Sequence, residues 1–162
     1  MKVRCDRSEL AQCLGDVLGI VPPLQSTKPI FQYFHLKTEA GALVVEATDL
    51  DIGAKIRLER VEVLEEGDVA VPAVRAASLV REIPDKQVSI DALPGGCGAV
   101  VSAQSCEFKL LGQDPTEFPE GPAFREDRGF GASREKFVDA LRRVAVAACR
   151  DMSRFQLTGV FF

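Results

Sequence analysis

The sequence predicts an α+β fold in which two helices pack on antiparallel sheets, and it predicts two copies of this domain with the second copy truncated. Three observations support this fold class. An amphipathic helix pattern occurs near the start of the chain and returns 127 residues later. About eight short apolar segments, several of them alternating, surround the helical segments. Finally, 46% of the 162 residues are hydrophobic, which is enough to form a core.

The repeated helix is expected from Asp6 to Leu18 and again from Ser133 to Ala145. Asp and Ser are residue types that cap helices, and Glu9 is placed to complete a capping box with Asp6. In both copies, apolar residues then recur at i, i+3, i+4, i+7 and i+8, which is the spacing of one helix face. The two apolar stripes consist of Leu10, Cys13, Leu14, Val17 and Leu18, and of Phe137, Ala140, Leu141, Val144 and Ala145.

The segments that follow the two helices repeat as well. Residues 28–34 and 154–160 align with a shift of 126 positions, and both lead from a polar loop into an apolar run. Solenoid repeats have periods of about 20–50 residues, so this longer period indicates a duplicated domain. We therefore expect a first domain at 1–111, an interdomain linker at 112–128 and the start of a second domain at 129–162.

Between the helices, apolar and polar residues alternate as they do in half-buried antiparallel strands. The clearest example is 52–58, where Ile52 and Ile56 are expected to face the core while Lys55 and Arg57 face solvent. The expected elements are strands at 2–5, 30–38, 43–47, 52–58 and 69–71, a second helix at 73–83, and strands at 88–92, 99–103 and 106–111.

The expected linker differs in composition from the rest of the chain. Residues 112–128 contain three prolines and show no hydrophobic periodicity. Phe118 and Phe124 are expected to pin this linker to the surface of the first domain.

Charge is distributed unevenly along the chain. The whole sequence carries a net charge of −4, which argues against a generally basic nucleic-acid-binding protein. Residues 1–128 carry a net charge of −7, whereas residues 129–162 carry +3. This asymmetry indicates local contact between the C-terminal part of the chain and an anion.

The sequence shows no feature of a membrane or metal protein. No apolar run approaches the roughly 18 residues of a membrane span, and the N-terminus has no signal-peptide-like apolar region. We therefore expect a cytoplasmic protein with no membrane partner. The five cysteines are scattered and include no CxxC pair, so we expect buried reduced thiols, no metal site and no cofactor.

Three features resemble catalytic groups, and each has a structural explanation. Asp49 and Asp51 could form a two-carboxylate metal site, but they alternate at a strand edge, so their carboxylates are expected to point to opposite faces. Acids in turns more often accept hydrogen bonds from nearby backbone N–H groups. His35 lies in an aromatic segment and is expected to be a packed or surface histidine. Gly95 to Gly98 follow Pro94, which favours a hairpin turn over a phosphate-binding loop. We therefore expect that the protein is not an enzyme.

Four segments in order, together with the duplication, make the sequence resemble a known family. These segments are Thr48–Asp51, Val71–Ala73 at the start of a helix, Leu110–Pro119 and Asp151–Val160. With this spacing the chain is similar to the bacterial DNA polymerase III beta subunit, the DNA sliding clamp. It resembles the N-terminal domain and the start of the central domain of that family. The resemblance implies the DNA-clamp fold, in which each domain has two helices and two antiparallel sheets.

The resemblance also implies a function. In this family, two chains of three domains each form a ring around duplex DNA, and the ring tethers the replicative polymerase as a processivity factor. The implied partners are double-stranded DNA bound without sequence preference, DNA polymerase III, the clamp loader and a second copy of the chain. These partners apply to the full-length protein. We expect this chain to be an N-terminal fragment of such a clamp, because it has no counterpart of the third domain or of the peptide-binding groove.

A protein that slides on DNA should contact phosphates loosely and read no bases, which suits Lys and Arg on helices. Arg142, Arg143 and Arg150 lie on or just after the second copy of the helix, away from its apolar stripe. The resemblance implies further contacts by the loop after each repeated helix and by the start of the 73–83 helix. Gln25 stands where the family often has a basic residue, and Asp16 is electrostatically unfavourable. The residues matched by the resemblance are Gln25, Lys28, Arg75, Asp151, Arg154, Phe155 and Gln156.

Other interpretations remain open at this point. A truncated clamp paralogue could act as a protein-interaction module through exposed sheet edges. A solvated helix face also suffices to explain Arg142 and Arg143. A metal-dependent nuclease that uses Asp49 is a third interpretation.

Overall fold

The computed structural model describes residues 1–22, 28–121, 129–149 and 151–161. The chain divides into two compact units, Met1–Gly121 (unit 1) and Pro122–Phe162 (unit 2).

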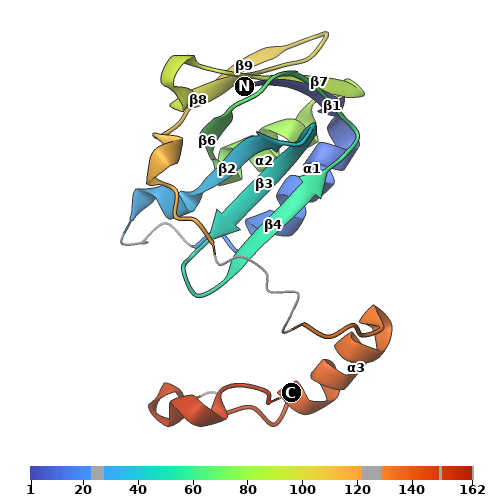
Figure 1. Cartoon of the computed structure of the whole chain (residues 1–162), viewed down its shortest axis with the longest axis vertical. Coiled ribbons are helices and arrows are strands. Elements are labelled where there is room, and N and C mark those ends of the chain that lie inside the picture. The colour runs from blue at the N-terminus through green and yellow to red at the C-terminus, as the bar shows by residue number, and fades with distance from the viewer. Residues whose placement is uncertain (23–27, 122–128, 150, 162) are drawn as a thin grey trace. The chain divides into compact units, whose positions relative to one another are not determined.

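In the described part of unit 1, two antiparallel sheets pack with two α-helices. Figure 1 shows their arrangement. The five-stranded sheet has the order β5-β1-β7-β8-β9, and the four-stranded sheet has the order β4-β3-β2-β6. This architecture confirms the predicted α+β class with antiparallel sheets. The elements are β1 Lys2–Asp6, α1 Arg7–Leu18, β2 Tyr33–Glu39, β3 Ala42–Thr48, β4 Gly53–Leu58, β5 Val61–Glu65, β6 Asp68–Pro72, α2 Ala73–Glu82, β7 Gln87–Ala92, β8 Gly98–Ser102 and β9 Glu107–Leu111.

Helix α1 starts where the sequence predicts, because Asp6 caps it. Asp6 Oδ1 accepts hydrogen bonds from the backbone N–H groups of Ser8 at 2.8 Å and Glu9 at 3.1 Å. These bonds satisfy two N–H groups that have no partner inside the helix. The expected return contact of a capping box is replaced by an ion pair, because Glu9 Oε1 accepts from Arg60 Nη1 at 3.1 Å.

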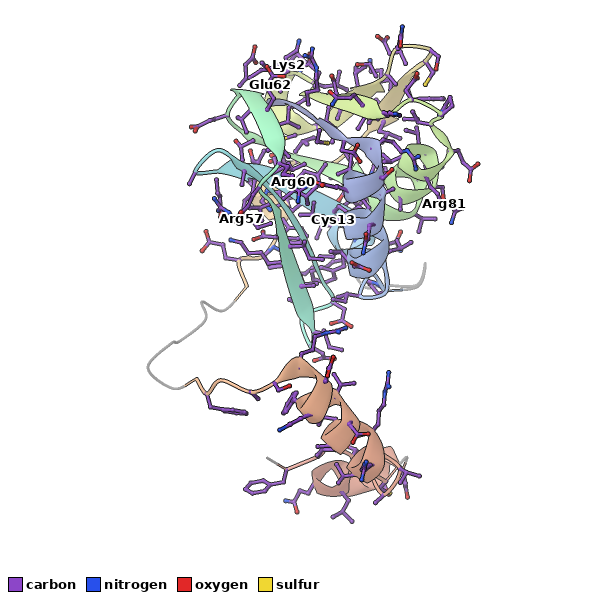
Figure 2. All side chains as sticks on the ribbon, turned by 90° about the vertical axis from the view of Figure 1, so that its right-hand side faces the viewer. Lys2, Cys13, Arg57, Arg60, Glu62 and Arg81 are labelled. Atoms are coloured by element: carbon purple, nitrogen blue, oxygen red, sulfur yellow. The ribbon has the colours of Figure 1, made fainter. Side chains whose placement is uncertain are left out.

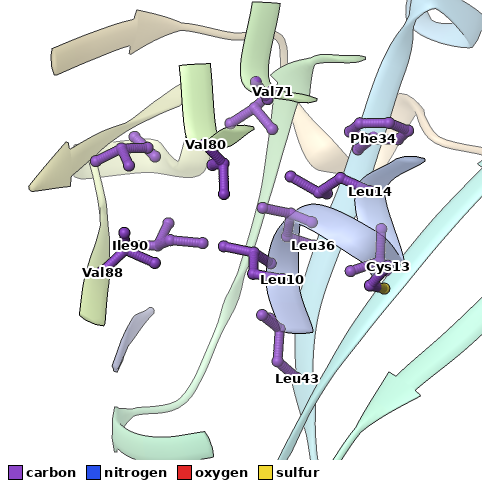
Figure 3. Packing of buried hydrophobic residues seen from close by; sticks show 14 of the residues in the cluster. Leu10, Cys13, Leu14, Phe34, Leu36, Leu43, Val71, Val80, Val88 and Ile90 are labelled. Atoms are coloured by element: carbon purple, nitrogen blue, oxygen red, sulfur yellow. The ribbon is translucent and has the colours of Figure 1, made fainter. Parts of the chain in front are cut away.

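The apolar stripe of α1 packs into a core that both sheets share. Leu10, Leu14 and Val17 are almost completely buried. Figure 3 shows Leu10 and Leu14 close to side chains from the four-stranded sheet, such as Phe34, and Val88 of the five-stranded sheet lies in the same cluster. Because one helix contacts both sheets, the two sheets and the helix form a single core.

Helix α2 packs against α1 through small residues. Ala73, Ala76 and Val80 are buried, and small side chains let two helices approach closely. Both helices lie on the same side of the four-stranded sheet (Figure 1). Ser78 and Arg81 face away from this packing, and Figure 2 shows Arg81 extending outward from α2.

The opposite faces of the sheets are polar and ion-paired. On the five-stranded sheet, Lys2 Nζ lies 2.7 Å from Asp91 Oδ2, and Arg4 Nη1 lies 3.3 Å from Glu62 Oε2. On the four-stranded sheet, Lys37 and Lys55 each form ion pairs with both Glu39 and Glu46. Exposed pairs of this kind contribute little to stability, but they leave these faces suited to solvent.

Three details differ from the sequence prediction. The strand expected at 30–38 begins only at Tyr33, because Pro29 opens a 3-10 helix, η1, Pro29–Gln32. Strand β5 was not predicted, since it is a short edge strand with few inward apolar residues. Ile52 is 60% exposed rather than inward, because it lies in the turn before β4.

The first part of the expected linker is a structured part of unit 1. Gln113 forms an isolated antiparallel bridge with Ala70, and a Cβ on Gly112 would collide with the carbonyl oxygen of Ala70. Phe118 packs against a small cluster that contains Phe31, and its ring centroid lies 5.0 Å from that of His35. Phe118 therefore pins this segment as expected, whereas Phe124 lies outside the described residues.

Unit 2 repeats the start of unit 1. Helix α3, Arg134–Ala145, has 12 residues like α1, and a 3-10 helix, η5, Met152–Leu157, follows it. Unlike Asp6, Ser133 makes no side-chain capping bond. No residue of α3 is buried, and Phe137 meets the ring of Phe130 edge-on at 6.3 Å.

The shared core yields a first prediction. Leu10→Ala should lower the free energy of unfolding by about 2–5 kcal/mol, because it leaves a cavity between helix and sheets. Urea denaturation followed by circular dichroism should show a lower midpoint with an unchanged slope. Leu64→Ala is the matched control, since Leu64 is 45% exposed and its loss should cost less than about 0.5 kcal/mol. Equal losses in the two variants would contradict this description of the core.

Candidate nucleic-acid interface

In unit 1, cations on the outward helix surface come from α2 rather than α1. Arg75 is exposed on the first turn of α2, next to the exposed Val74. It borders a hollow formed where α1 ends and α2 begins. The outward residues of α1 include Gln12 and Asp16, and its last turn contains no basic residue. Arg75 therefore lies where an anion could approach, and α1 adds no positive charge beside it.

In unit 2, two predicted contact residues are exposed on α3 but differ in their partners. Arg143 Nη2 lies 2.8 Å from Asp139 Oδ2, one helical turn earlier. Arg142 is exposed and has no ion pair within the described part of the chain. Arg142 is consequently the stronger candidate for phosphate contact, because the charge of Arg143 is partly neutralised.

The loops after the repeated helices each lead into a short 3-10 helix. Lys28 is exposed and directly precedes η1, while Arg154, Phe155 and Gln156 lie within η5, where Gln156 is exposed. Asp151 precedes η5, and its Oδ1 accepts a 2.9 Å hydrogen bond from the backbone N–H of Ser153. Gln25 and Arg150 lie outside the described residues.

The carboxylates considered as a metal site stabilise a turn instead. Asp49 Oδ1 accepts from the backbone N–H groups of Asp51 at 3.0 Å and Ile52 at 2.7 Å. Thr48 Oγ1 accepts from Leu50 N at 3.0 Å, and Leu50 adopts a φ of 81°. Within the described ranges, no group of three or more His, Cys, Asp or Glu residues is arranged to hold a metal ion.

His35 is buried between two carboxylates, an arrangement that sequence reasoning missed. Its Nε2 donates to Asp68 Oδ2 at 3.0 Å, and its Nδ1 lies 3.3 Å from Glu46 Oε2. The pairing of β2 with β3 places His35 opposite Glu46, so a correct strand register would have predicted that contact. The contact with Asp68 depends on the β2–β6 pairing, which connects residues distant in sequence. With the Phe118 ring against it, His35 helps hold the segment after β9.

The five cysteines are free thiols with different exposure. Cys5 and Cys13 are buried, as expected, and the pKa of each thiol is raised to about 12. Burial is the main cause, and nearby carboxylates, including Asp6 for Cys5 and Asp16 for Cys13, contribute to the increase. Cys97 is exposed, contrary to the expectation of buried thiols, because it follows the turn at Pro94–Gly96. The buried thiols are poor nucleophiles and poor metal ligands.

Comparison with protein families gives a match over most of the chain. Residues 1–122 match the model of the DNA polymerase III beta subunit, N-terminal domain. The chain is 31% identical to the beta sliding clamp of Chlamydia trachomatis over 161 residues, which cover 99% of this chain and 38% of that protein. It is 32% identical to the beta sliding clamp of Streptomyces coelicolor over 160 residues, covering 99% and 41%. The chain thus spans about two fifths of the length of these relatives.

Solved structures share the fold. The DNA polymerase sliding clamp of Bacillus subtilis superposes with a TM-score of 0.93 at 22% identity, covering 99% of this chain and 43% of that chain. The sliding clamp of Bartonella birtlesii, solved bound to griselimycin, gives a TM-score of 0.90 at 25% identity, covering 100% and 43%. None of the described helices is long and apolar enough to cross a membrane.

The cysteine environments lead to a second prediction. At pH 8, a thiol-specific reagent should modify Cys97 first, while Cys5 and Cys13 should react only after denaturation. Because the folded-state pKa of both buried thiols is raised, their neutral form stabilises the fold below about pH 9. That contribution should be lost as the pH rises toward about 12. Peptide mapping after a short pulse of thiol reagent measures the order in which the cysteines are modified, and Cys97→Ser is the control. Early labelling of Cys5 would contradict the predicted environment.

Proposed function

The chain belongs to the DNA polymerase III beta subunit family, and from this we propose that it is the N-terminal part of a DNA sliding clamp. Such a clamp encircles duplex DNA and tethers the replicative polymerase, so that it acts as a processivity factor and not as an enzyme. The match of residues 1–122 to the N-terminal domain of this family is the observation that carries the proposal. We also propose the division into 1–111, a linker at 112–128 and the start of a central domain at 129–162.

The exposed cations on the helices support weak, sequence-independent binding of DNA. Arg75 and Arg142 are exposed on α2 and α3. Isolated Lys and Arg side chains bind phosphates through charge, and this attraction falls steeply with salt. Weak contact suits a protein that must slide, because a closed ring and not tight binding would keep it on the DNA. Lys28, Arg143, Arg150, Arg154, Phe155 and Gln156 remain proposed contacts, and Gln25 is the least supported.

An exposed sheet edge supports assembly with a second copy. Strand β9 is at the edge of the five-stranded sheet, and it exposes Phe108 by 41% and Leu111 by 70%. An unpaired edge with apolar side chains is suited to pair with another chain. We propose that this edge contributes to a homodimeric ring in the full-length protein. DNA polymerase III and the clamp loader are the further proposed partners, and the cytoplasm is the proposed location.

Topology gives the direct test of this function. The full-length protein, once loaded, should remain on nicked circular DNA but slide off linear DNA of the same length. Gel filtration of the loaded complexes measures the retained fraction, and linearising the circle with a restriction enzyme should release the protein. Equal retention on circular and linear DNA would contradict the clamp function.

The helix cations can be tested separately. Arg75→Ala and Arg142→Ala should each weaken binding to duplex DNA and lower the slope of log K against log salt by about 0.9, since each removes about one phosphate contact. Fluorescence anisotropy at several salt concentrations measures both quantities. Arg57→Ala is the matched control, because Arg57 is exposed on β4 rather than on a helix (Figure 2). If Arg57→Ala lowered the affinity for duplex DNA as much as Arg75→Ala, this result would argue against DNA contact through the helices.

A further inference from the structure

Asp151 is an acidic residue in a segment whose other charges are basic. Arg142, Arg143, Arg150 and Arg154 surround it in the sequence. A carboxylate close to a DNA phosphate is repelled, so direct contact between Asp151 and DNA would be unfavourable. Another role is needed to explain an acid at this position.

The hydrogen bonds of Asp151 show such a role. Asp151 directly precedes η5, and its Oδ1 accepts from the backbone N–H of Ser153 at 2.9 Å. This backbone bond, together with a bond from the Ser153 hydroxyl, holds the pKa of the Asp151 carboxyl below its usual value. The carboxylate thus satisfies an N–H group at the start of a helical turn, as capping residues do.

The backbone around Asp151 is closed by a second set of bonds. The N–H of Cys149 donates to the carbonyl oxygen of Leu157 at 2.8 Å, and the N–H of Asp151 donates to Cys149 Sγ at 3.4 Å. The first bond joins the two ends of the segment, and the second fixes the backbone where η5 begins. Residues 154–156 lie inside this closed turn, so their backbone direction depends on how the turn starts.

A second acid in unit 2 has a different use. Asp139 Oδ2 lies 2.8 Å from Arg143 Nη2 on α3, so this carboxylate forms an ion pair with a cation. The carboxylate of Asp151 instead bonds to the backbone and hydroxyl groups of Ser153. An amide side chain could also accept the Ser153 bond, although more weakly than a carboxylate, whereas it could not replace the charge of Asp139.

We propose that Asp151 is a positioning residue, which caps η5 and fixes the backbone of residues 154–156, the segment proposed to contact DNA. The acceptor oxygen carries this role, and the negative charge strengthens the hydrogen bond without being needed for contact with DNA. The inference rests on the proposed function, because it assigns the presented residues to DNA contact.

Three substitutions separate the oxygen from the charge. Asp151→Asn keeps the acceptor atom and should bind a short duplex at least as tightly as the unmodified chain. Asp151→Ala removes the acceptor and should weaken binding about fivefold, which is within the range that a capping residue is worth. Asp151→Glu keeps the charge but displaces the acceptor, so it should also weaken binding. Glu135→Gln is the control for removing an acid elsewhere in unit 2, because Glu135 is exposed on the first turn of α3.

Binding is measured by fluorescence anisotropy on the full chain, and hydrogen exchange of the Ser153 amide reports the cap. The proposal predicts faster exchange in Asp151→Ala but not in Asp151→Asn. If Asp151→Asn and Asp151→Ala tightened DNA binding equally, the proposal would be overturned, because Asp151 would then act only as a repulsive charge. If both substitutions weakened DNA binding equally, the proposal would be overturned as well, since the charge would then be required. If the unmodified chain does not bind the short duplex, the proposed DNA contacts of residues 154–156 are overturned, whereas retention of the full-length protein on circular DNA still decides the proposed function and the exchange rates still decide the capping role.

Discussion

The burial of one stripe on α1 determines how the rest of unit 1 is arranged. Leu10, Leu14 and Val17 pack into a core formed by residues of both sheets. If the helix moved away from this core, apolar side chains of both sheets would be exposed to water. Helix α2 completes this layer through its small buried residues. As a result, each sheet keeps one face for the core and one for solvent, and the outward surfaces of the two helices remain free. The function proposed for the chain depends on those outward helix surfaces.

Charge pairing differs from one exposed cation to the next. Lys2 and Lys55 on the sheets lie within 3.0 Å of a carboxylate, and on the helices Arg81 and Arg143 pair with Glu82 and Asp139. Arg75 and Arg142 form no ion pair in the ranges that the structure describes. Such unpaired cations let a chain with a net charge of −4 still attract a polyanion locally. They also explain why the count of acidic and basic residues alone is a poor guide to binding.

Periodicity predicted most of the fold, because helices and half-buried strands repeat their apolar residues at fixed spacings. The repeat of Asp6–Leu18 at Ser133–Ala145 identified both copies of the helix. Strand β5 and the late start of β2 were missed, since an edge strand has little apolar pattern and a proline-led turn interrupts an apolar run. The site was less predictable. The resemblance placed Asp151 among the DNA contacts, but the direction of its carboxylate depends on a hydrogen bond that no sequence pattern specifies.

The central claim is that the helix side of unit 1, and not the outer face of its sheets, meets DNA. Photo-crosslinking in the full-length protein loaded on circular DNA tests it most directly. A crosslinker attached through Ser78→Cys on α2 or through Glu62→Cys on β5, each in a background in which Cys97, Cys106 and Cys149 are replaced by Ser, probes the two surfaces at exposed positions. The account predicts DNA adducts from position 78 and none above background from position 62. Adducts of equal yield at both positions, or adducts only from position 62, would contradict it.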